Sequence, residues 1–139
     1  MLLRISLLFI MCITTLSMSS CFVTSHDYSF EVSCEDFAEN GHYSSDLVLE
    51  VGDKIKLELC SNQSTGFKWD YEITTANIVK EEDHDFEEPE EGVVGAAGKE
   101  LWTFEAVETG TTEIQMEYSQ PWEGGTKAEW TYIISVTVE

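Results

Sequence analysis

The sequence contains very little positive charge. Its 139 residues include seven Lys and Arg against 27 Asp and Glu, and the single Arg, Arg4, lies near the N-terminus. From Phe22 onward, six Lys face all 27 acidic residues, which leaves 21 net negative charges with His neutral. Proteins that bind nucleic acid or anionic lipid need Lys and Arg to neutralise phosphate groups. The composition therefore argues against both partners and favours faster encounter with basic ones.

Residues that catalyse reactions or bind metals are also scarce. The three His residues, His26, His42 and His84, lie outside the turn segments described below. A hydrolytic nucleophile needs a paired base, and a metal needs clustered ligands; the sequence shows neither pattern. Residues 81–91 include eight acidic side chains but lack the spacing of a calcium loop, and with Pro89 we expect a solvated, mobile loop there. The sequence therefore predicts neither an enzyme nor a metal or cofactor site.

Long apolar runs are missing after the first 21 residues. There, Arg4 precedes the apolar run Ile5–Leu16, and small residues follow before Cys21, which is the order of a secretory signal. The run is shorter than the roughly 20 residues of a transmembrane helix. Met18–Cys21 resembles the cleavage box of bacterial lipoproteins, so an acylated Cys21 and an ordinary signal peptide containing a Cys both stay open. Either alternative predicts an exported protein, periplasmic, at the cell surface or secreted, with residues 22–139 as one domain.

Cysteine is scarce in the exported part, where only Cys34 and Cys60 follow Cys21. In an oxidising compartment these two residues could form a disulfide. In the alternating pattern, Cys34 falls on the same strand face as the apolar residues Phe30 and Val32. Cys60 falls on the opposite face from Leu57 and Leu59. A disulfide and two free thiols therefore both stay open.

Helical periodicity is missing as well, because most of the chain alternates apolar and polar residues with period two. The alternation predicts strands over residues 28–34, 54–60, 67–73, 78–82, 99–107, 111–118 and 128–138, with a minor strand over 47–49. No segment sustains a 3.6-residue period long enough for a helix that would organise the fold. About seven to eight short strands in about a hundred residues predict an all-β fold, an immunoglobulin-like antiparallel β-sandwich.

Three turn segments separate the predicted strands, at Ser61–Phe67, Gly92–Gly98 and Gln120–Gly125. The chain reverses at each connection, so every second loop returns to the same end of a sandwich, and we expect these three to be neighbours. Taken singly, each segment is an ordinary turn rich in Gly, Pro, Ser or Asn. The glycine-rich one also lacks the Lys-Ser/Thr ending of a phosphate loop.

Taken together, the three segments resemble the chagasin-type inhibitors of papain-family cysteine peptidases. Asn62-Gln63-Ser64-Thr65-Gly66-Phe67 is similar to the Asn-Pro-Thr-Thr-Gly-Tyr/Phe signature of that family. Gly95-Ala96-Ala97-Gly98 is similar to its Gly-x-Gly-Gly element, and Gln120-Pro121-Trp122 to its Arg-Pro-Trp/Phe element. The order of the elements matches, and the resemblance covers residues 27–139.

The resemblance implies a reversible inhibitor that inserts its three loops into the active-site cleft of a papain-family cysteine peptidase. Thr65 and Gly66 would lie nearest the catalytic thiolate, where Gly permits close approach of the backbone. Trp122 would supply a large, rigid contact surface, and Pro121 would order its loop in advance. The sequence predicts a monomer without a cofactor, and it predicts membrane contact only if Cys21 carries an N-terminal lipid.

The chain departs from the family pattern at four positions. Gln63 stands in place of Pro and removes a fixed φ, and Gln120 stands in place of Arg and removes a charge. Ser64 in place of Thr is a mild change, and Ala97 in place of Gly matters only if its φ must be positive. We expect altered affinity for particular peptidases rather than loss of inhibition. An exported immunoglobulin-like adhesion or carbohydrate-binding module, with Trp122 as a sugar platform, stays open as the alternative.

Overall fold

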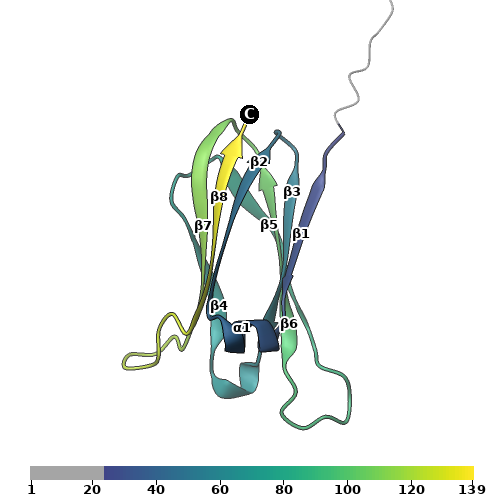
Figure 1. Ribbon diagram of the computed structural model, residues 1–139, viewed down its shortest axis with the longest axis vertical. Helices are drawn as coiled ribbons and strands as arrows, with labels where there is room; N and C mark the ends of the chain where they lie inside the picture. Colours follow the sequence, from purple (N-terminus) through teal and green to yellow (C-terminus); the bar gives the residue numbers. More distant parts are fainter. Residues whose placement is uncertain (1–23) are drawn as a thin grey trace, which may run out of the picture.

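The computed structural model describes residues 24–139, which form two packed four-stranded sheets (Figure 1). One sheet has the order β1 (Asp27–Val32), β3 (Lys54–Ser61), β6 (Gly98–Ala106), β5 (Val79–Glu87). The other has the order β2 (His42–Leu49), β8 (Trp130–Val138), β7 (Gly110–Ser119), β4 (Lys68–Ile73). The predicted all-β sandwich is confirmed. The predicted signal segment, with Cys21, lies outside the described residues, and residues 24–139 contain no helix long and apolar enough to cross a membrane.

Two strand pairs are parallel, which differs from the expected antiparallel arrangement. β1 runs parallel to β3, and β2 runs parallel to β8. Parallel neighbours need a crossover connection, and between β1 and β3 the chain passes through the opposite sheet as β2. Side chains alternate between the two faces in both kinds of pair, so the period-two pattern does not distinguish them.

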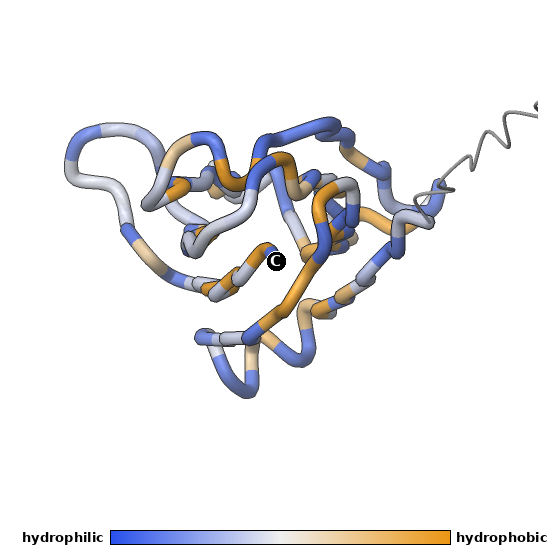
Figure 2. The backbone as a smooth tube through the Cα atoms, turned by 90° about the horizontal axis from the view of Figure 1, so that it is seen from above, coloured by the Kyte–Doolittle hydropathy of each residue, from blue (hydrophilic) through white to orange (hydrophobic). Residues whose placement is uncertain are grey.

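The core consists of alternate residues of the strands. In β6, every second residue from Gly98 to Ala106 is buried and those between are half-buried. Apolar and polar residues are accordingly interspersed along the chain when the two layers are seen from above (Figure 2). The large, fully buried apolar side chains are Phe37, Leu49, Ile55, Leu57, Leu59, Phe104, Ile114, Met116, Ile134 and Val136. Burial of each such side chain contributes about 1.5–3 kcal/mol, so this alternation is the main source of stability.

A short helix, α1 (Cys34–Glu39), follows β1, so that the strand expected over residues 28–34 ends two residues early. The Ser33 hydroxyl accepts the N–H of Asp36 at 3.1 Å, and the Asp36 carboxylate accepts the N–H of Ser33 at 3.0 Å. This reciprocal capping box starts the helix. Phe37 is buried and stacks on Trp130 with ring centroids 4.8 Å apart. The helix therefore covers one end of the core, although its six residues are too few to show a helical period.

The acidic segment after residue 80 is a strand, which corrects the expectation of a solvated loop over 81–91. β5 pairs antiparallel with β6 as far as Glu87, with an irregular register between Glu81 and Asp83. β5 is an edge strand, and all its side chains except Val79 and Phe86 are exposed. Acidic side chains are compatible with an edge because they remain in water and discourage pairing with another chain. Pro89 lies beyond the last paired residue.

At the end of the sandwich where the described chain begins, Asp53 fastens the β2–β3 turn to the segment before β1. Asp53 is only 1% exposed, and its carboxylate accepts the N–H groups of His26 at 2.8 Å and Glu50 at 2.9 Å. Burial raises the pKa of this carboxyl, but the donors from Glu50 and His26 outweigh burial and hold the pKa below its usual 3.8. Asp53 therefore stabilises the fold as a carboxylate.

We predict that this stabilisation disappears in acid. Because the folded-state pKa is lowered, the contribution of Asp53 is complete above the usual value of 3.8 and is lost as the pH falls through the folded-state pKa. Asp53→Asn should therefore lower the Tm at about pH 5 by a margin that shrinks progressively below pH 3.8. Thermal unfolding of both proteins across this range measures the margin. An equal margin in strong acid and at about pH 5 would contradict the prediction.

Candidate functional site

Three connections meet at the end of the sandwich opposite the C-terminus (Figure 1). We call them the central loop (residues 62–67, between β3 and β4), the glycine loop (88–97, between β5 and β6) and the tryptophan loop (120–129, between β7 and β8). In the view of Figure 1 the central loop lies between the other two. The structure thus brings together the three segments that strand counting placed at one end.

The central loop is shaped by its own short polar side chains. Residues Gln63–Thr65 form a 3-10 turn capped by Asn62, whose side-chain oxygen accepts the N–H of Ser64 at 3.2 Å and its hydroxyl at 2.6 Å. The Thr65 hydroxyl donates to the carbonyl of Asn62 at 2.7 Å. Gly66 ends the turn in the left-handed region at φ 78°, a conformation that favours Gly. The loop is therefore a folded turn rather than an extended segment.

The residue that replaces Pro does not disturb this turn. Gln63 is the first residue of the 3-10 turn, and its carbonyl accepts the N–H of Gly66 at 3.2 Å. Pro favours the first position of a helix because its fixed φ suits that position. Here the contacts of Asn62 and Thr65 hold the turn without it.

The tryptophan loop supports the central loop from one side. The indole of Trp122 lies directly on Gly66, so close that a Cβ at this position would overlap the ring and lie 2.9 Å from its Cζ3. The side-chain amide of Gln120 donates to the carbonyl of Thr65 at 3.5 Å. Trp122 nevertheless stays 49% exposed, so part of the indole remains available to a partner. Gly66 is therefore required both by its positive φ and by this close packing.

Gln120, which replaces the family's Arg, closes its own loop. Its side-chain oxygen accepts the N–H of Thr126 at 2.9 Å, and its own backbone N–H donates to the carbonyl of Thr126 at 2.8 Å. Lys127 donates to the carbonyls of Gln120 and Trp122. The tryptophan loop thus has an internal scaffold, and Pro121 and Trp122 stand exposed at its surface.

The glycine loop approaches the central loop from the other side. The side-chain amide of Asn62 donates to the carbonyl of Gly95 at 3.4 Å. Gly95 has a positive φ of 78°. The φ of Ala97 is not positive, so Ala in place of Gly causes no backbone strain there. Gly98 is the buried first residue of β6, and a Cβ there would overlap the carbonyl of Glu87. Gly98 therefore belongs to the scaffold.

Two further residues of the glycine loop are candidates that the sequence pattern did not single out. Val93 and Val94 are exposed, Val93 by 61% and Val94 fully. Both belong to the glycine-rich segment, but the family resemblance rests on residues 95–98 and does not include them. Two adjacent apolar side chains held in water are the signal that could have identified them.

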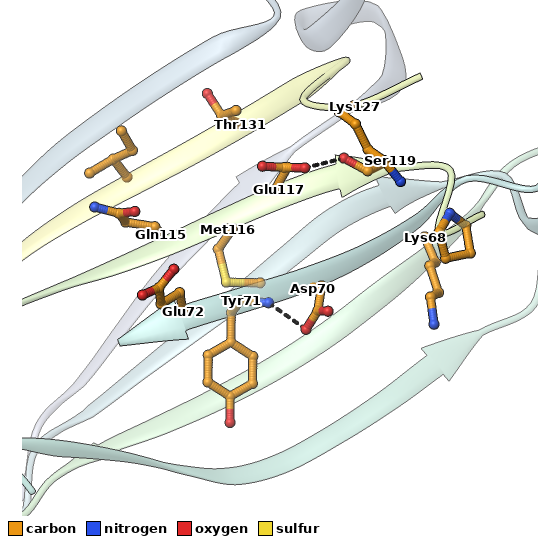
Figure 3. A pocket seen from close by; sticks show the side chains of 12 residues that line it. Lys68, Asp70, Tyr71, Glu72, Gln115, Met116, Glu117, Ser119, Lys127 and Thr131 are labelled. Carbon is orange, nitrogen blue, oxygen red and sulfur yellow. Dashed lines mark hydrogen bonds between the residues drawn. The ribbon is translucent and has the colours of Figure 1, made fainter. Parts of the chain in front are cut away.

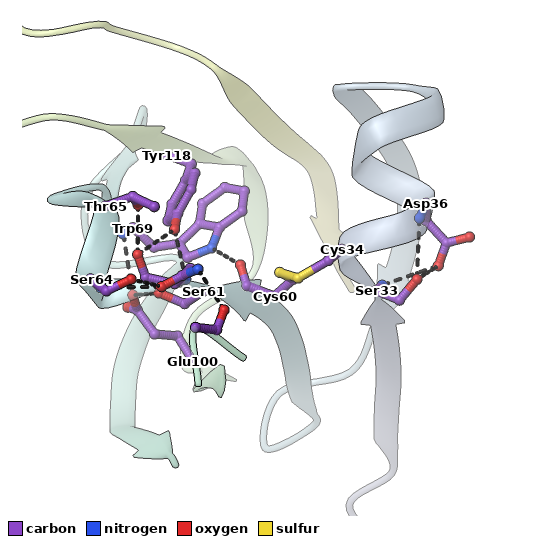
Figure 4. The surroundings of a disulfide bond; sticks show 12 residues. Ser33, Cys34, Asp36, Cys60, Ser61, Ser64, Thr65, Trp69, Glu100 and Tyr118 are labelled. Carbon is purple, nitrogen blue, oxygen red and sulfur yellow. Dashed lines mark hydrogen bonds between the residues drawn. A yellow bond between two sulfur atoms is a disulfide. The ribbon is translucent and has the colours of Figure 1, made fainter. Parts of the chain in front are cut away.

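Beneath the loops, aromatic and polar contacts fix their stems (Figure 4). The Tyr118 hydroxyl accepts the N–H of Asn62 at 2.8 Å, and Phe67 stacks on the Tyr118 ring at 5.2 Å between centroids. Cys34 and Cys60 form a disulfide with their Cα atoms 5.1 Å apart, which ties α1 to the end of β3. Phe67 is half-buried and supports the loop through its contact with Tyr118.

A shallow, open groove lies on the outer face of β4, β7 and β8, beside the tryptophan loop (Figure 3). Lys68, Tyr71 and Lys127 are among its lining residues. The Tyr71 hydroxyl donates to Glu81, and this hydrogen bond, together with burial and nearby negative charge, raises the pKa of Tyr71 to about 12.

Within residues 24–139 no group of three or more His, Cys, Asp or Glu is placed to hold a metal ion. Among the exposed large apolar side chains of the described residues, Val93, Val94 and Trp122 lie at the loop end.

A family model decides the identity of the chain. The model of the chagasin family peptidase inhibitor I42 matches residues 48–136, a span that contains all three loops. The chain belongs to the chagasin family of peptidase inhibitors. Over 93 residues it is 32% identical to amoebiasin-2 of Entamoeba histolytica, a match that covers 66% of this chain and 76% of that protein. Over 87 residues it is 29% identical to chagasin of Trypanosoma cruzi, covering 60% of this chain and 79% of that protein.

A solved structure agrees with these sequence matches. The crystal structure of the cysteine protease inhibitor EhICP2 from Entamoeba histolytica superposes on this chagasin-family chain with a TM-score of 0.66 and 25% identity. The match covers 83% of this chain and 97% of that one. The resemblance drawn from three short loop segments is therefore confirmed, and the chain is a peptidase inhibitor rather than an enzyme or an adhesion module.

Proposed function

We propose that this chagasin-family protein inhibits papain-family cysteine peptidases reversibly, with its central loop in the active-site cleft and the other two loops on the rims. The observation that carries this proposal is the position of the central loop between two loops that both contact it, through Asn62 to Gly95 and through Trp122 to Gly66. Thr65 is exposed on this loop, beside the half-buried Gly66. These two residues would approach the catalytic thiolate most closely.

The shape of the central loop explains why it would block the cleft without being cleaved. Peptide cleavage requires a scissile carbonyl held in line with the attacking nucleophile. The carbonyls of Asn62 and Gln63 already accept hydrogen bonds within the 3-10 turn, and Gly66 turns the chain back at φ 78°. Binding would therefore present a folded turn, with two of its carbonyls in internal hydrogen bonds and the Thr65 carbonyl accepting from Gln120, rather than an extended peptide.

The flanking loops would supply most of the contact energy. Trp122 on one side and Val93 with Val94 on the other are exposed apolar side chains. Large aromatic residues in interfaces contribute disproportionately to affinity. The strong negative charge of the protein would add faster encounter with a peptidase of basic surface, an effect that salt reduces.

We also propose that the inhibitor acts outside the cytoplasm, as a monomer. The proposed location rests on the signal-like residues 1–21 and is supported by the Cys34–Cys60 disulfide, a bond that persists in oxidising compartments. Residues 22–139 would then be the mature domain, attached to a membrane only if Cys21 carries a lipid.

The proposed function is tested with purified residues 24–139 and a panel of papain-family peptidases. We expect inhibition that is competitive, that is reversed on dilution, and that leaves the inhibitor intact by mass spectrometry. A serine peptidase serves as the control and should be unaffected. Absence of inhibition at micromolar protein, or cleavage within residues 62–67, would contradict the proposal.

A further inference from the structure

Directly below the central loop, β6 carries a carboxylate in the core. Glu100 is only 4% exposed and is paired in register with Leu59 of β3 and Phe86 of β5. A buried carboxylate is strongly destabilising unless hydrogen bonds or an opposite charge compensate for the lost water. The partners of Glu100 therefore indicate what the residue does.

One oxygen of Glu100 contacts both stems of the central loop (Figure 4). Oε1 accepts the hydroxyl of Ser61 at 2.7 Å and the backbone N–H of Trp69 at 3.4 Å. Ser61 is the last residue of β3, just before the loop, and Trp69 is the second residue of β4, just after it. Because β3 and β4 belong to different sheets, the two stems are not paired with each other. Glu100 bridges them.

The second oxygen connects the same carboxylate to β5. Oε2 lies 3.1 Å from Nε2 of His84, whose ring stacks on Trp102 with centroids 3.5 Å apart and planes 11° from parallel. β5 continues from His84 to Glu87 and then into the glycine loop. Glu100 thus contacts the strands that lead into two of the three loops.

We infer that Glu100 is a positioning residue for inhibition: its carboxylate fixes the separation of the central-loop stems and, through His84, their position relative to the strand that enters the glycine loop. This inference rests on the proposed function for its effect on inhibition. Its structural half, the restraint of residues 62–67, exists in the free protein and can be measured without a peptidase.

The opposite end of the sandwich provides a matched control. Asp53 is also a buried carboxylate that accepts hydrogen bonds from two segments and has a His neighbour, with His26 Nδ1 at 3.6 Å. Replacement of either acid by an apolar residue of similar size removes a buried hydrogen-bonded carboxylate. Of these two acids, only Glu100 lies below the loops. A change in loop position should therefore follow substitution of Glu100 alone, whereas a loss of stability can follow substitution of either acid.

The test compares Glu100→Met, Glu100→Gln and Asp53→Leu in residues 24–139. We expect Glu100→Met to raise the Ki for a papain-family peptidase by about tenfold or more and to accelerate hydrogen exchange of the amides of residues 62–67. In Glu100→Gln the Ki and the exchange rates of residues 62–67 should stay within about threefold of the wild type, because the amide oxygen still accepts from Ser61 and Trp69. Asp53→Leu should lower the Tm and leave both values unchanged.

An unchanged Ki together with unchanged exchange in Glu100→Met would overturn the inference, and so would an equal rise in Ki for Asp53→Leu. If Glu100→Met does not fold, Ser61→Ala removes only the hydroxyl that donates to Oε1 and should raise exchange in the same six residues. If the wild type inhibits no peptidase, the proposed function fails, while the exchange data still decide whether Glu100 restrains the loop.

Discussion

Gly66→Glu is expected to abolish inhibition, with a rise in Ki of at least about a thousandfold, which corresponds to about 4 kcal/mol of binding free energy. Any Cβ at this position overlaps the Trp122 indole, so the substitution displaces the aromatic side chain that flanks the central loop. It also places a carboxylate on the loop that we propose enters the cleft. Enzyme titration against a papain-family peptidase measures the effect.

The same substitution will also reduce stability, but to a limited extent. Gly66 has φ 78°, and a residue with a side chain costs about 1–2 kcal/mol in that conformation. Gly52→Glu is the matched control, because Gly52 has φ 99° and lies at the opposite end of the sandwich, and a Cβ there would meet open space. Its Tm should fall while its Ki stays at the wild-type value. A Gly66→Glu protein that inhibits normally would rule out the central loop as the segment in the cleft.

Removal of the disulfide is expected to have the largest effect on stability. The double substitution Cys34→Ala and Cys60→Ala opens a loop with a sequence separation of 26 residues. The chain entropy regained by the unfolded state should lower the free energy of unfolding by about 3 kcal/mol. Denaturant titration of the double variant and the wild type measures this difference.

A reducing agent provides the control for this prediction. Reduction should shift the unfolding midpoint of the wild type toward that of the double variant and leave the variant itself unchanged. Because Cys60 lies next to Ser61 at the stem of the central loop, the reduced protein should also show faster amide exchange in residues 62–67. A wild-type midpoint that does not respond to reduction would show that the disulfide contributes nothing to stability.

The fold was predictable where side-chain alternation alone decides the structure. Strands such as β6 and β7 have one buried and one outer face, and their sequences record this directly. The parallel pairing of β1 with β3 was not predictable, because alternation is identical in parallel and antiparallel strands. Helix α1 depends on the Ser33–Asp36 capping box instead of a period. The strand over residues 81–87 was not predicted because its acidic side chains lack the alternation with apolar residues. An edge strand tolerates such side chains because they stay in water.

The candidate site was predictable as a set of loops but not as a set of contacts. The ordered segments at residues 62–67, 95–98 and 120–122 indicated the loop end. The burial of each residue depends on three-dimensional packing: Phe67 is half-buried against Tyr118, Gly98 is buried, and Val93 and Val94 are exposed. Glu100 carries no sequence signal, because only the structure shows that a single acid on a neighbouring strand contacts residues on both sides of the central loop.

Both ends of the described chain lie far from the three loops. β1 begins, and β8 ends, at the end of the sandwich opposite to them (Figure 1). The protein can therefore be coupled to a solid support through either terminus with its loops directed outward, so that an oriented column would capture active peptidases from a mixture. An attached lipid at the N-terminus would act in the same way, holding the loops one sandwich length away from the membrane surface.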